Sequence, residues 1–320
     1  MHDENDGWKD AAAGAGSCDA PSQPVIATPR RVLKQTTFIR VGGWQRHRGG
    51  AGTLCDGASQ LLPSHRASCK ARRSDYLGRV QISVIVPAFN EEKLLGASLA
   101  EIRAAAAAFT RHGWGVELIV CDNNSTDRTA DIARAAGAKV VFEPVNQIAR
   151  ARNAGAAAAT GAWLIFVDAD THPSADLFAD VAEQISSGNC VAGGATIRMD
   201  ENILAANVAT ELWNWTSRIK KWMAGSFIFV ETAAFRELGG FSHEHFAAEE
   251  LDLSQRLKKL ARLAGKKIVV LHRHPIKTSA RKLKLYTPRE MWAFFFRSLF
   301  NHRRTVRSRE QAYLWYDGRR

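Results

Sequence analysis

The sequence has little cysteine and no long uncharged run. Its 320 residues include five cysteines, none in a CxxC spacing, so nothing indicates a disulfide framework or a zinc site. The longest stretch without a formally charged side chain, 153–167, has 15 residues and is short for a membrane span. The first 20 residues carry acids and lack an apolar core, so we expect no cleavable secretory signal and a cytoplasmic protein.

Positive charge is in excess, with a formal net charge of +12, and it is unevenly placed. Residues 254–320 carry 19 Lys or Arg against 3 Asp or Glu, whereas residues 81–253 carry 13 against 22. A basic nucleic-acid-binding protein is one hypothesis for such a chain. The acidic middle and the lack of RNA-recognition, zinc-finger or helix-turn-helix signatures argue against it, so we expect no nucleic-acid partner.

The chain has two parts that differ in composition and periodicity. Residues 1–79 lack sustained periodicity and are rich in Gly, Ala, Ser and Arg, which predicts a disordered extension; a small docked subdomain is the alternative. From residue 81, buried-type strands alternate with helices, which predicts an α/β fold with a doubly wound, mostly parallel sheet. The expected strands are 82–87, 116–121, 138–142 and 163–167, with helices at 91–109, 125–136 and 148–159.

The second half is less regular. We expect strands at 191–197, 226–230 and 267–271 and helices at 202–223, 249–263 and 288–300. The folded domain should therefore cover 80–275, followed by a basic, aromatic segment at 276–320.

Polar side chains follow three of the expected strands, at 87–92, 122–127 and 168–170. A single acidic strand end is usually a helix cap, but ligands bind beyond the carboxyl ends of parallel strands, where these three groups would meet. Asp168 and Asp170 flank one small residue, a spacing at which two carboxylates can reach one Mg²⁺ or Mn²⁺ ion.

Five motifs carry a resemblance to a known family. VIVPAFNEE (84–92), CDNNSTDRTADIA (121–133), ARNAGAAAATGAWLIFVDAD (151–170), GGF (239–241) and EELDLSQRL (249–257) together resemble family 2 glycosyltransferases. The resemblance covers about 81–260. It implies the GT-A fold of nucleotide-diphospho-sugar transferases, with a nucleotide-binding half at 80–170 and an acceptor half at 171–275.

The resemblance also implies roles for single residues. It assigns the nucleotide-sugar contacts to Pro87, Phe89, Glu91, Asp122, Arg152, Asn153 and Asp168. Asp122 matches the aspartate that binds the base, usually uracil. Asn123 stands where the family often has a second aspartate, which leaves the base open.

The metal and the catalytic base are implied in the same way. Asp168 and Asp170 match the DxD motif, with Asp170 favoured as the direct metal ligand. Glu249-Glu250 matches a Glu-Asp pair whose second member is the usual base, so Glu250 is the candidate base and Glu249 the alternative. A stretch of acids in a first helical turn, favoured by the helix dipole, is the structural alternative.

The basic C-terminal quarter adds further candidates. His272 and His274 follow an expected strand and are candidates for a third metal ligand, or else ordinary surface histidines. Arg281 and Lys282 suit a diphosphate, or else form a solvated basic face. The apolar stretch within 288–304 is flanked by basic residues and fits either a core helix or peripheral contact with an anionic membrane.

Together these features predict an inverting, Mn²⁺- or Mg²⁺-dependent glycosyltransferase that moves a single sugar from a nucleotide-diphospho-sugar, a UDP-sugar by preference, to an acceptor hydroxyl. A lipid-linked acceptor, a cell-envelope glycan precursor and a small molecule all remain open. A GT-A nucleotidyltransferase is the remaining alternative, but residues 87–90 read Pro-Ala-Phe-Asn in place of its Gly-rich phosphate loop.

Overall fold

The computed structural model describes residues 80–281, 285, 290, 307–310 and 312. The expected extension at 1–79, Lys282 and, apart from Glu290, the expected helix and membrane segment at 288–304 lie outside these residues.

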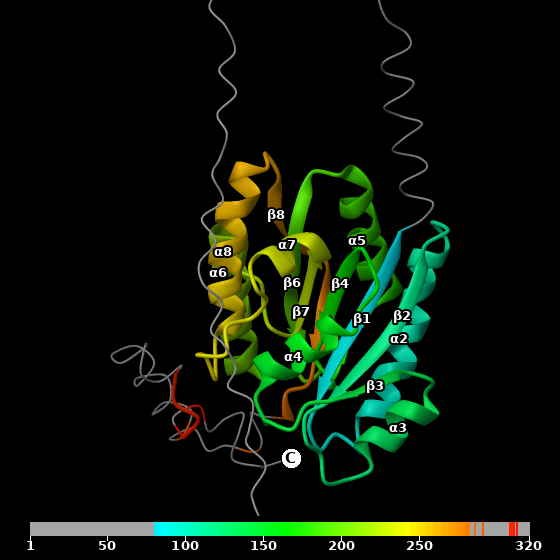
Figure 1. Ribbon diagram of the computed structural model, residues 1–320. Helices are drawn as coiled ribbons and strands as arrows, with labels where there is room; N and C mark the ends of the chain where they lie inside the picture. Colours follow the sequence, from blue (N-terminus) through cyan, green and yellow to red (C-terminus); the bar gives the residue numbers. More distant parts are fainter. Residues whose placement is uncertain (1–79, 282–284, 286–289, 291–306, 311, 313–320) are drawn as a thin grey trace, which may run out of the picture. The chain divides into compact units, whose positions relative to one another are not determined.

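One sheet organises the described domain, with the strand order β3-β2-β1-β4-β7-β6-β8-β5 (Figure 1). Its first half is parallel and consists of β1 (Gln81–Ala88), β2 (Gly115–Asp122), β3 (Lys139–Phe142) and β4 (Trp163–Val167). β1 and β4 are buried along nearly their whole length, because both faces of the sheet are covered. The predicted α/β architecture is confirmed.

The second half of the sheet reverses direction. β7 (Phe227–Glu231) runs antiparallel to both β4 and β6 (Cys190–Met199), and β8 (Lys267–Thr278) runs parallel to β6. The short β5 (Thr171–His172) pairs with the end of β8. β8 continues to Thr278, past the strand end predicted at 271 and the domain boundary predicted at 275, so the fold extends beyond that boundary.

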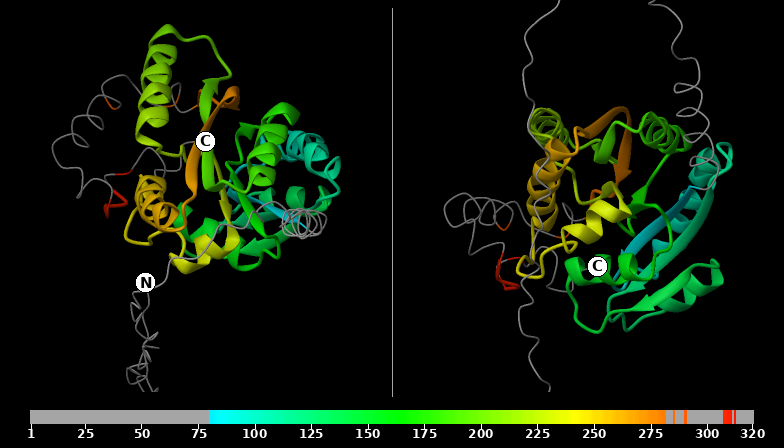
Figure 2. Two further views of the ribbon diagram at one scale, coloured as in Figure 1. Left: turned by 90° about the horizontal axis from the view of Figure 1, so that it is seen from above. Right: turned by 45° about the horizontal axis from the view of Figure 1, so that its top comes forward.

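Two apolar cores lie on the two faces of the sheet. One is filled mainly by α2 (Leu95–Thr110) and α5 (Ala175–Ser187), with the shorter α3 (Thr129–Ala135) packed beside it. The other holds side chains of α4 (Ile148–Ala157), α7 (Thr232–Glu237) and α8 (Glu249–Leu263). α6 (Leu204–Lys220) packs on β6, and its C-terminal end comes near α8, as the bond from Lys258 to the carbonyl of Lys220 shows (Figure 2).

α4 lies unusually close to the sheet, and a glycine makes this possible. A Cβ at Gly155 would lie 2.5 Å from Ile85 Cγ2, in the middle of β1. This close contact fixes the distance of α4 from β1, and with it the position of the α4 side chains that lie near the strand ends.

We predict that Gly155→Ala destabilises the fold by about 1–3 kcal/mol, because the added methyl overpacks α4 against β1. Gly96→Ala, on the exposed side of α2, is the matched control. Its Cβ would meet its nearest neighbour, Ile132, at an ordinary 3.6 Å. That variant should gain about 0.5–1 kcal/mol of helix stability. Urea unfolding of both variants checks the pair, and equal effects would contradict the role assigned to Gly155.

Candidate active site

The polar loops after β1 and β2 are locked to one another by hydrogen bonds. Ser125 Oγ accepts from the Asn90 backbone N–H at 3.0 Å, and Thr129 Oγ1 accepts from that of Glu91 at 2.8 Å. In return, Asn90 Oδ1 accepts from the Thr126 backbone N–H at 2.8 Å. Much of the polar sequence at these two strand ends therefore holds loop geometry, and it fixes Asp122 at the rim of the sheet.

Asn123, the departure from the family pattern, has a structural task. Its amide donates to the carbonyls of Glu143 (3.1 Å) and Val145 (2.6 Å), while its Oδ1 accepts from the Gln147 backbone N–H. An aspartate could not donate to two carbonyls. Asn123 thus anchors the chain between β3 and α4, and Asp122 remains as the acidic side chain at this strand end.

The ends of β1 and β4 are bridged by an arginine from the far end of the domain. Arg281 donates to both carboxylate oxygens of Glu91, at 2.8 and 3.0 Å, and lies 3.6 Å from Asp170. Arg281, predicted to suit a diphosphate or else to form a solvated basic face, lies at this edge of the sheet. The structure brings Glu91, Asp170 and Arg281 together, although Arg281 is separated from Glu91 by 190 positions.

Arg152 is the centre of a second cluster and is fully buried. It donates to Asp168 at 2.8 Å, to Glu249 at 2.5 Å and to the carbonyl of Gly225 at 2.8 Å. Burial alone would lower the pKa of Arg152, but the carboxylates of Asp168 and Glu249 outweigh it and raise that pKa above its usual value. This guanidinium therefore stays charged and joins the DxD end of β4 to the start of α8.

The neighbour of Arg152 supports a loop. Asn153 Nδ2 donates to the carbonyl of Phe241 at 2.8 Å, and its Oδ1 accepts from the Phe241 backbone N–H at 2.9 Å. Gly240 has a φ of +73°, and a Cβ there would lie 2.5 Å from Asn153 Oδ1. The GGF motif therefore forms a turn whose backbone passes close to the side chain of Asn153, and a glycine at position 240 leaves room for this contact.

Glu249 and Glu250 have different environments, although they are adjacent. Glu249 is buried and paired with Arg152, whereas Glu250 lines a cavity and has no ion-pair partner among the described residues. Burial, and next the charge of Glu249, raise the pKa of Glu250 to about 8, with Arg152 opposing. Ala248, at a φ of +60°, begins α8 and turns the chain so that both carboxylates fall in its first turn.

A cavity of about 450 Å³ joins the two pairs of carboxylates, since Asp168, Asp170, Glu249 and Glu250 all line it. β6, α6 and the residues after β8 form other parts of its wall. Within the described chain, three of the polar atoms of its lining residues, Arg152 Nε, Trp213 Nε1 and Ser226 Oγ, are buried without a hydrogen-bond partner. Buried unpaired donors are costly, so the cavity is suited to a polar ligand.

Several predicted site residues lie elsewhere. His274 contacts Asp180 of α5 at 3.0 Å and His272 is exposed on β8, so the structure does not bring either to Asp168 and Asp170. The reason is the length of β8, whose end at the site is Thr278. Over the described residues, no group of three His, Cys, Asp or Glu is arranged to hold a metal. Pro87 is the last residue but one of β1, Phe89 follows the strand, and Lys282 is outside the described residues.

Four residues that line the cavity were not predicted from the sequence: Met199, Trp213, Ser226 and Thr278. None belongs to a chemical motif. An indole at 213, in a helix rich in tryptophan, was the one available signal.

Comparison with known proteins places this geometry in a class. A mannosyltransferase from Pyrobaculum calidifontis, solved with GDP-Man and Mn²⁺, superposes with a TM-score of 0.52 at 20% identity, over 71% of this chain and 61% of that one. Glucosyl-3-phosphoglycerate synthase from Mycobacterium tuberculosis, solved with Mn²⁺, UDP and phosphoglyceric acid, gives 0.51 at 17% identity, over 75% and 84%. The fold is the GT-A fold of glycosyltransferases.

The family is narrower than the fold. The model for glycosyl transferase family 2 matches residues 83–238, just under half of the chain, and so supports a family 2 glycosyltransferase. An uncharacterized glycosyltransferase of Mycobacterium tuberculosis is 36% identical over 139 residues, which is 43% of this chain and 55% of that protein. The 4,4'-diaponeurosporenoate glycosyltransferase of Staphylococcus haemolyticus is 49% identical over 59 residues, 18% of this chain and 14% of that protein. The match thus spans about half the length of the mycobacterial relative.

We predict that Arg152→Met lowers the free energy of unfolding by about 3–5 kcal/mol, because it removes the guanidinium that pairs with the buried Glu249 and the partly buried Asp168. Adding Glu249→Gln to Arg152→Met should recover part of that loss. Arg150→Met, on the same helix, is the matched control, since Arg150 donates to the neutral side chain of Gln147. Urea titration measures all three, and an Arg152→Met effect no larger than that of Arg150→Met would refute the assignment.

A second prediction concerns pH and stability. The raised pKa means that folded Glu250 keeps its proton from about pH 5 to about pH 8, while the unfolded chain releases it. Stability of the wild type should therefore fall with rising pH relative to Glu250→Gln. Thermal unfolding at pH 5.5 and 8.5 in chelator should show the Tm advantage of the variant growing with pH. A constant difference would be incompatible with the raised pKa; Glu237→Gln, on the exposed end of α7, is the control.

Proposed function

We propose that this protein transfers a single sugar from a nucleotide-diphospho-sugar to an acceptor hydroxyl, with inversion at the anomeric carbon. The observation that carries the proposal is the cavity into which both the DxD carboxylates and Glu250 open. Such a site needs groups that neutralise a leaving diphosphate and a base beside the acceptor, and the two ends of the cavity supply candidates for each.

The donor would bind over the ends of β1, β2 and β4, in a nucleotide-binding half that reaches to about residue 170. Asp122 is the proposed contact to the base. Glu91 and Arg281 are bound to one another and border the same edge, next to Asp170. UDP is the preferred nucleotide. GDP is the alternative to test, because the two structural relatives were solved with UDP and with GDP-Man.

A divalent cation fits the donor side. Asp168 and Asp170 are hard oxygen ligands on the cavity wall, and two carboxylates leave coordination positions for diphosphate oxygens. Mn²⁺, present in both structural relatives, or Mg²⁺ would neutralise charge on the leaving diphosphate when bound. Asp170 is the proposed direct ligand, because Asp168 is already paired with Arg152.

Glu250 is the proposed base. Glu249 is held by Arg152, so its lone pairs are committed to a counter-ion, whereas Glu250 faces the cavity. The acceptor oxygen would attack the anomeric carbon as its proton passes to the ionised form of Glu250, which the raised pKa makes a stronger base than an ordinary carboxylate. The bond from that carbon to the diphosphate oxygen breaks, and a direct displacement of this kind inverts the centre. Trp213 Nε1 and Ser226 Oγ are candidates to position the acceptor, because both are buried and unpaired within the described chain.

The acceptor half would run from about residue 171 to the end of the described fold. Ile197, Met199, Trp213 and Phe246 give its cavity walls an apolar character. This lining supports an acceptor with an apolar portion near the reacting hydroxyl, as a lipid-linked acceptor has.

Two variants should separate binding from transfer. Asp170→Asn should weaken Mn²⁺-dependent binding of a UDP-sugar by roughly 100-fold, because a metal ligand is lost. Glu250→Gln should bind the donor normally and lower transfer by about 10²–10⁴-fold, because the base is lost. Thermal shift with and without Mn²⁺ measures binding, and release of UDP in the presence of acceptor measures transfer.

Asp176→Asn, on the exposed start of α5, is the control and should change neither quantity. Transfer by Glu250→Gln at the wild-type rate would eliminate Glu250 as the base. A metal-dependent shift with GDP-mannose and none with UDP-sugars would reassign the donor base.

A further inference from the structure

α6 has an apolar side that no described part of the chain covers. The side chains of Leu204, Val208, Leu212, Trp215 and Ile219 are all more than half exposed, at 55–80%. At about 100° per residue they fall within an arc of about 80°, a continuous stripe along the helix. We call these five residues the α6 stripe. Isolated exposed apolar residues are ordinary, but a helix-long stripe marks an interaction surface.

The helix cannot turn this stripe inward. Ala206, Ala209, Thr210 and Trp213 of α6 line the cavity, on the opposite side of the helix from the stripe. Asn214 locks that orientation through two bonds to the backbone of Ile197 on β6, at 2.8 and 2.9 Å. One face of α6 thus belongs to the acceptor cavity and the other points away from it.

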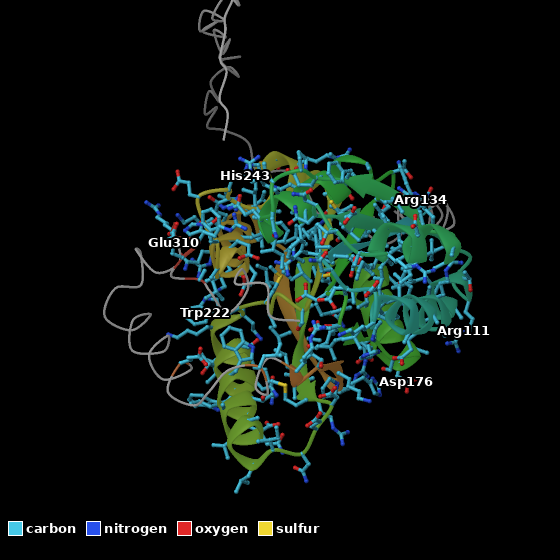
Figure 3. The ribbon with its side chains drawn as sticks, turned by 90° about the horizontal axis from the view of Figure 1, so that it is seen from below. Arg111, Arg134, Asp176, Trp222, His243 and Glu310 are labelled. Carbon is cyan, nitrogen blue, oxygen red and sulfur yellow. The ribbon has the colours of Figure 1, made fainter. Side chains whose placement is uncertain are left out.

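Positive charge gathers at the C-terminal end of the stripe. α6 and α8 contribute six cations there: Arg218, Lys220, Lys221, Lys258, Lys259 and Arg262. Lys258 donates to the carbonyl of Lys220 and lies over the ring of Trp222, 5.9 Å from its centroid. Burial, then the neighbouring Arg262 and Lys220, lower the pKa of Lys258, as expected where cations crowd. Trp222 lies on the side of the domain away from Arg111 and Arg134 (Figure 3).

These cations are not neutralised within the described chain, where none of the six forms an ion pair with a carboxylate. Glu211 is the acidic side chain on the flank of the stripe. The surface therefore combines an apolar stripe, an exposed tryptophan and a cationic end.

We propose that the α6 stripe docks this protein on an anionic lipid surface. The cations at the C-terminal end of the stripe would contact lipid headgroups, and the apolar side chains of the stripe would enter the interface between headgroups and acyl chains. α6 has 17 residues and is about 25 Å long, so it would lie along the surface. No helix among the described residues is sufficiently long and apolar to traverse a bilayer.

Charge selects lipid over the two other occupants. A second copy docked through its own stripe would bring the same cationic cluster to the interface. The chain's own residues 282–320 carry ten Lys or Arg and three Asp or Glu, so their net charge has the same sign as the cluster. An anionic surface complements the cluster.

The arrangement would place the acceptor cavity about one helix diameter, or roughly 10 Å, from the lipid surface, because α6 separates the two. A lipid-linked acceptor could then reach Glu250 without leaving the membrane. Docking itself does not depend on the proposed transfer reaction, and it is tested without it.

The test is flotation of the full chain with two kinds of vesicle. One is phosphatidylcholine alone, and the other is phosphatidylcholine with roughly 30% phosphatidylglycerol, which makes the vesicle surface anionic. The wild type should float with the anionic vesicles, and less as salt is raised. Leu212→Gln combined with Trp215→Gln should weaken binding at least about tenfold through lost apolar burial. Arg218→Gln, Lys220→Gln and Lys221→Asn together should weaken it on the order of 100-fold.

Phe142→Gln, an exposed aromatic on β3 remote from α6, is the matched control and should bind as the wild type does. Thermal unfolding of each variant checks that the fold is kept. No flotation of the wild type at low salt, or undiminished flotation of the Leu212/Trp215 variant, would overturn the proposal. So would a wild-type dimer in light scattering that this variant converts to monomer, since a second copy would then cover the stripe.

Discussion

A single buried guanidinium holds the candidate active site together. Arg152 sits on α4, but its partners come from the end of β4, the chain before β7 and the first turn of α8. A buried cation of this kind is stable because carboxylates and a carbonyl satisfy it, and those carboxylates are in turn stable because of the cation. The position of α4 is set by the close contact of Gly155 with β1, so packing in the core reaches directly to the charges of the site.

The same interaction divides the labour between two adjacent glutamates. Glu249 pairs with Arg152 as its counter-ion. Burial, together with the charge of Glu249, raises the pKa of Glu250. Similar residues one position apart thus acquire different chemistry, since consecutive side chains at the start of a helix point about 100° apart. The left-handed Ala248 sets which of them turns toward Arg152.

Much of the fold could be predicted from the sequence, and each element that was not predicted has a specific physical reason. β1, β2 and β4 were predictable because buried parallel strands are continuous apolar runs, and α8 because acids mark its first turn. Helix α5 was missed even though Ser174 caps its start and the left-handed Gly188 ends it. The direction of β7 and the full length of β8 depend on pairing between distant strands, which leaves no periodic signal.

Side-chain partners were harder still. In the sequence, Asn123 leaves the identity of the nucleotide base open, and in the structure its amide ties a loop through two carbonyls. His272 and His274 follow a predicted strand end, but the strand continues past them. In both cases the role of the side chain depends on backbone several residues away: the carbonyls of Glu143 and Val145 for Asn123, and the end of β8 at Thr278 for the two histidines.

The contact between Glu91 and Arg281 has a consequence for how the protein is made. It closes a loop of 190 positions, between the first strand of the sheet and the end of the last long one. During synthesis from the N-terminus, the β1–β2 end of the sheet can form while Glu91 still lacks this partner. This edge of the sheet is complete only when nearly the whole domain has left the ribosome, so a nascent or truncated chain that ends before Arg281 lacks the guanidinium that pairs with both carboxylate oxygens of Glu91.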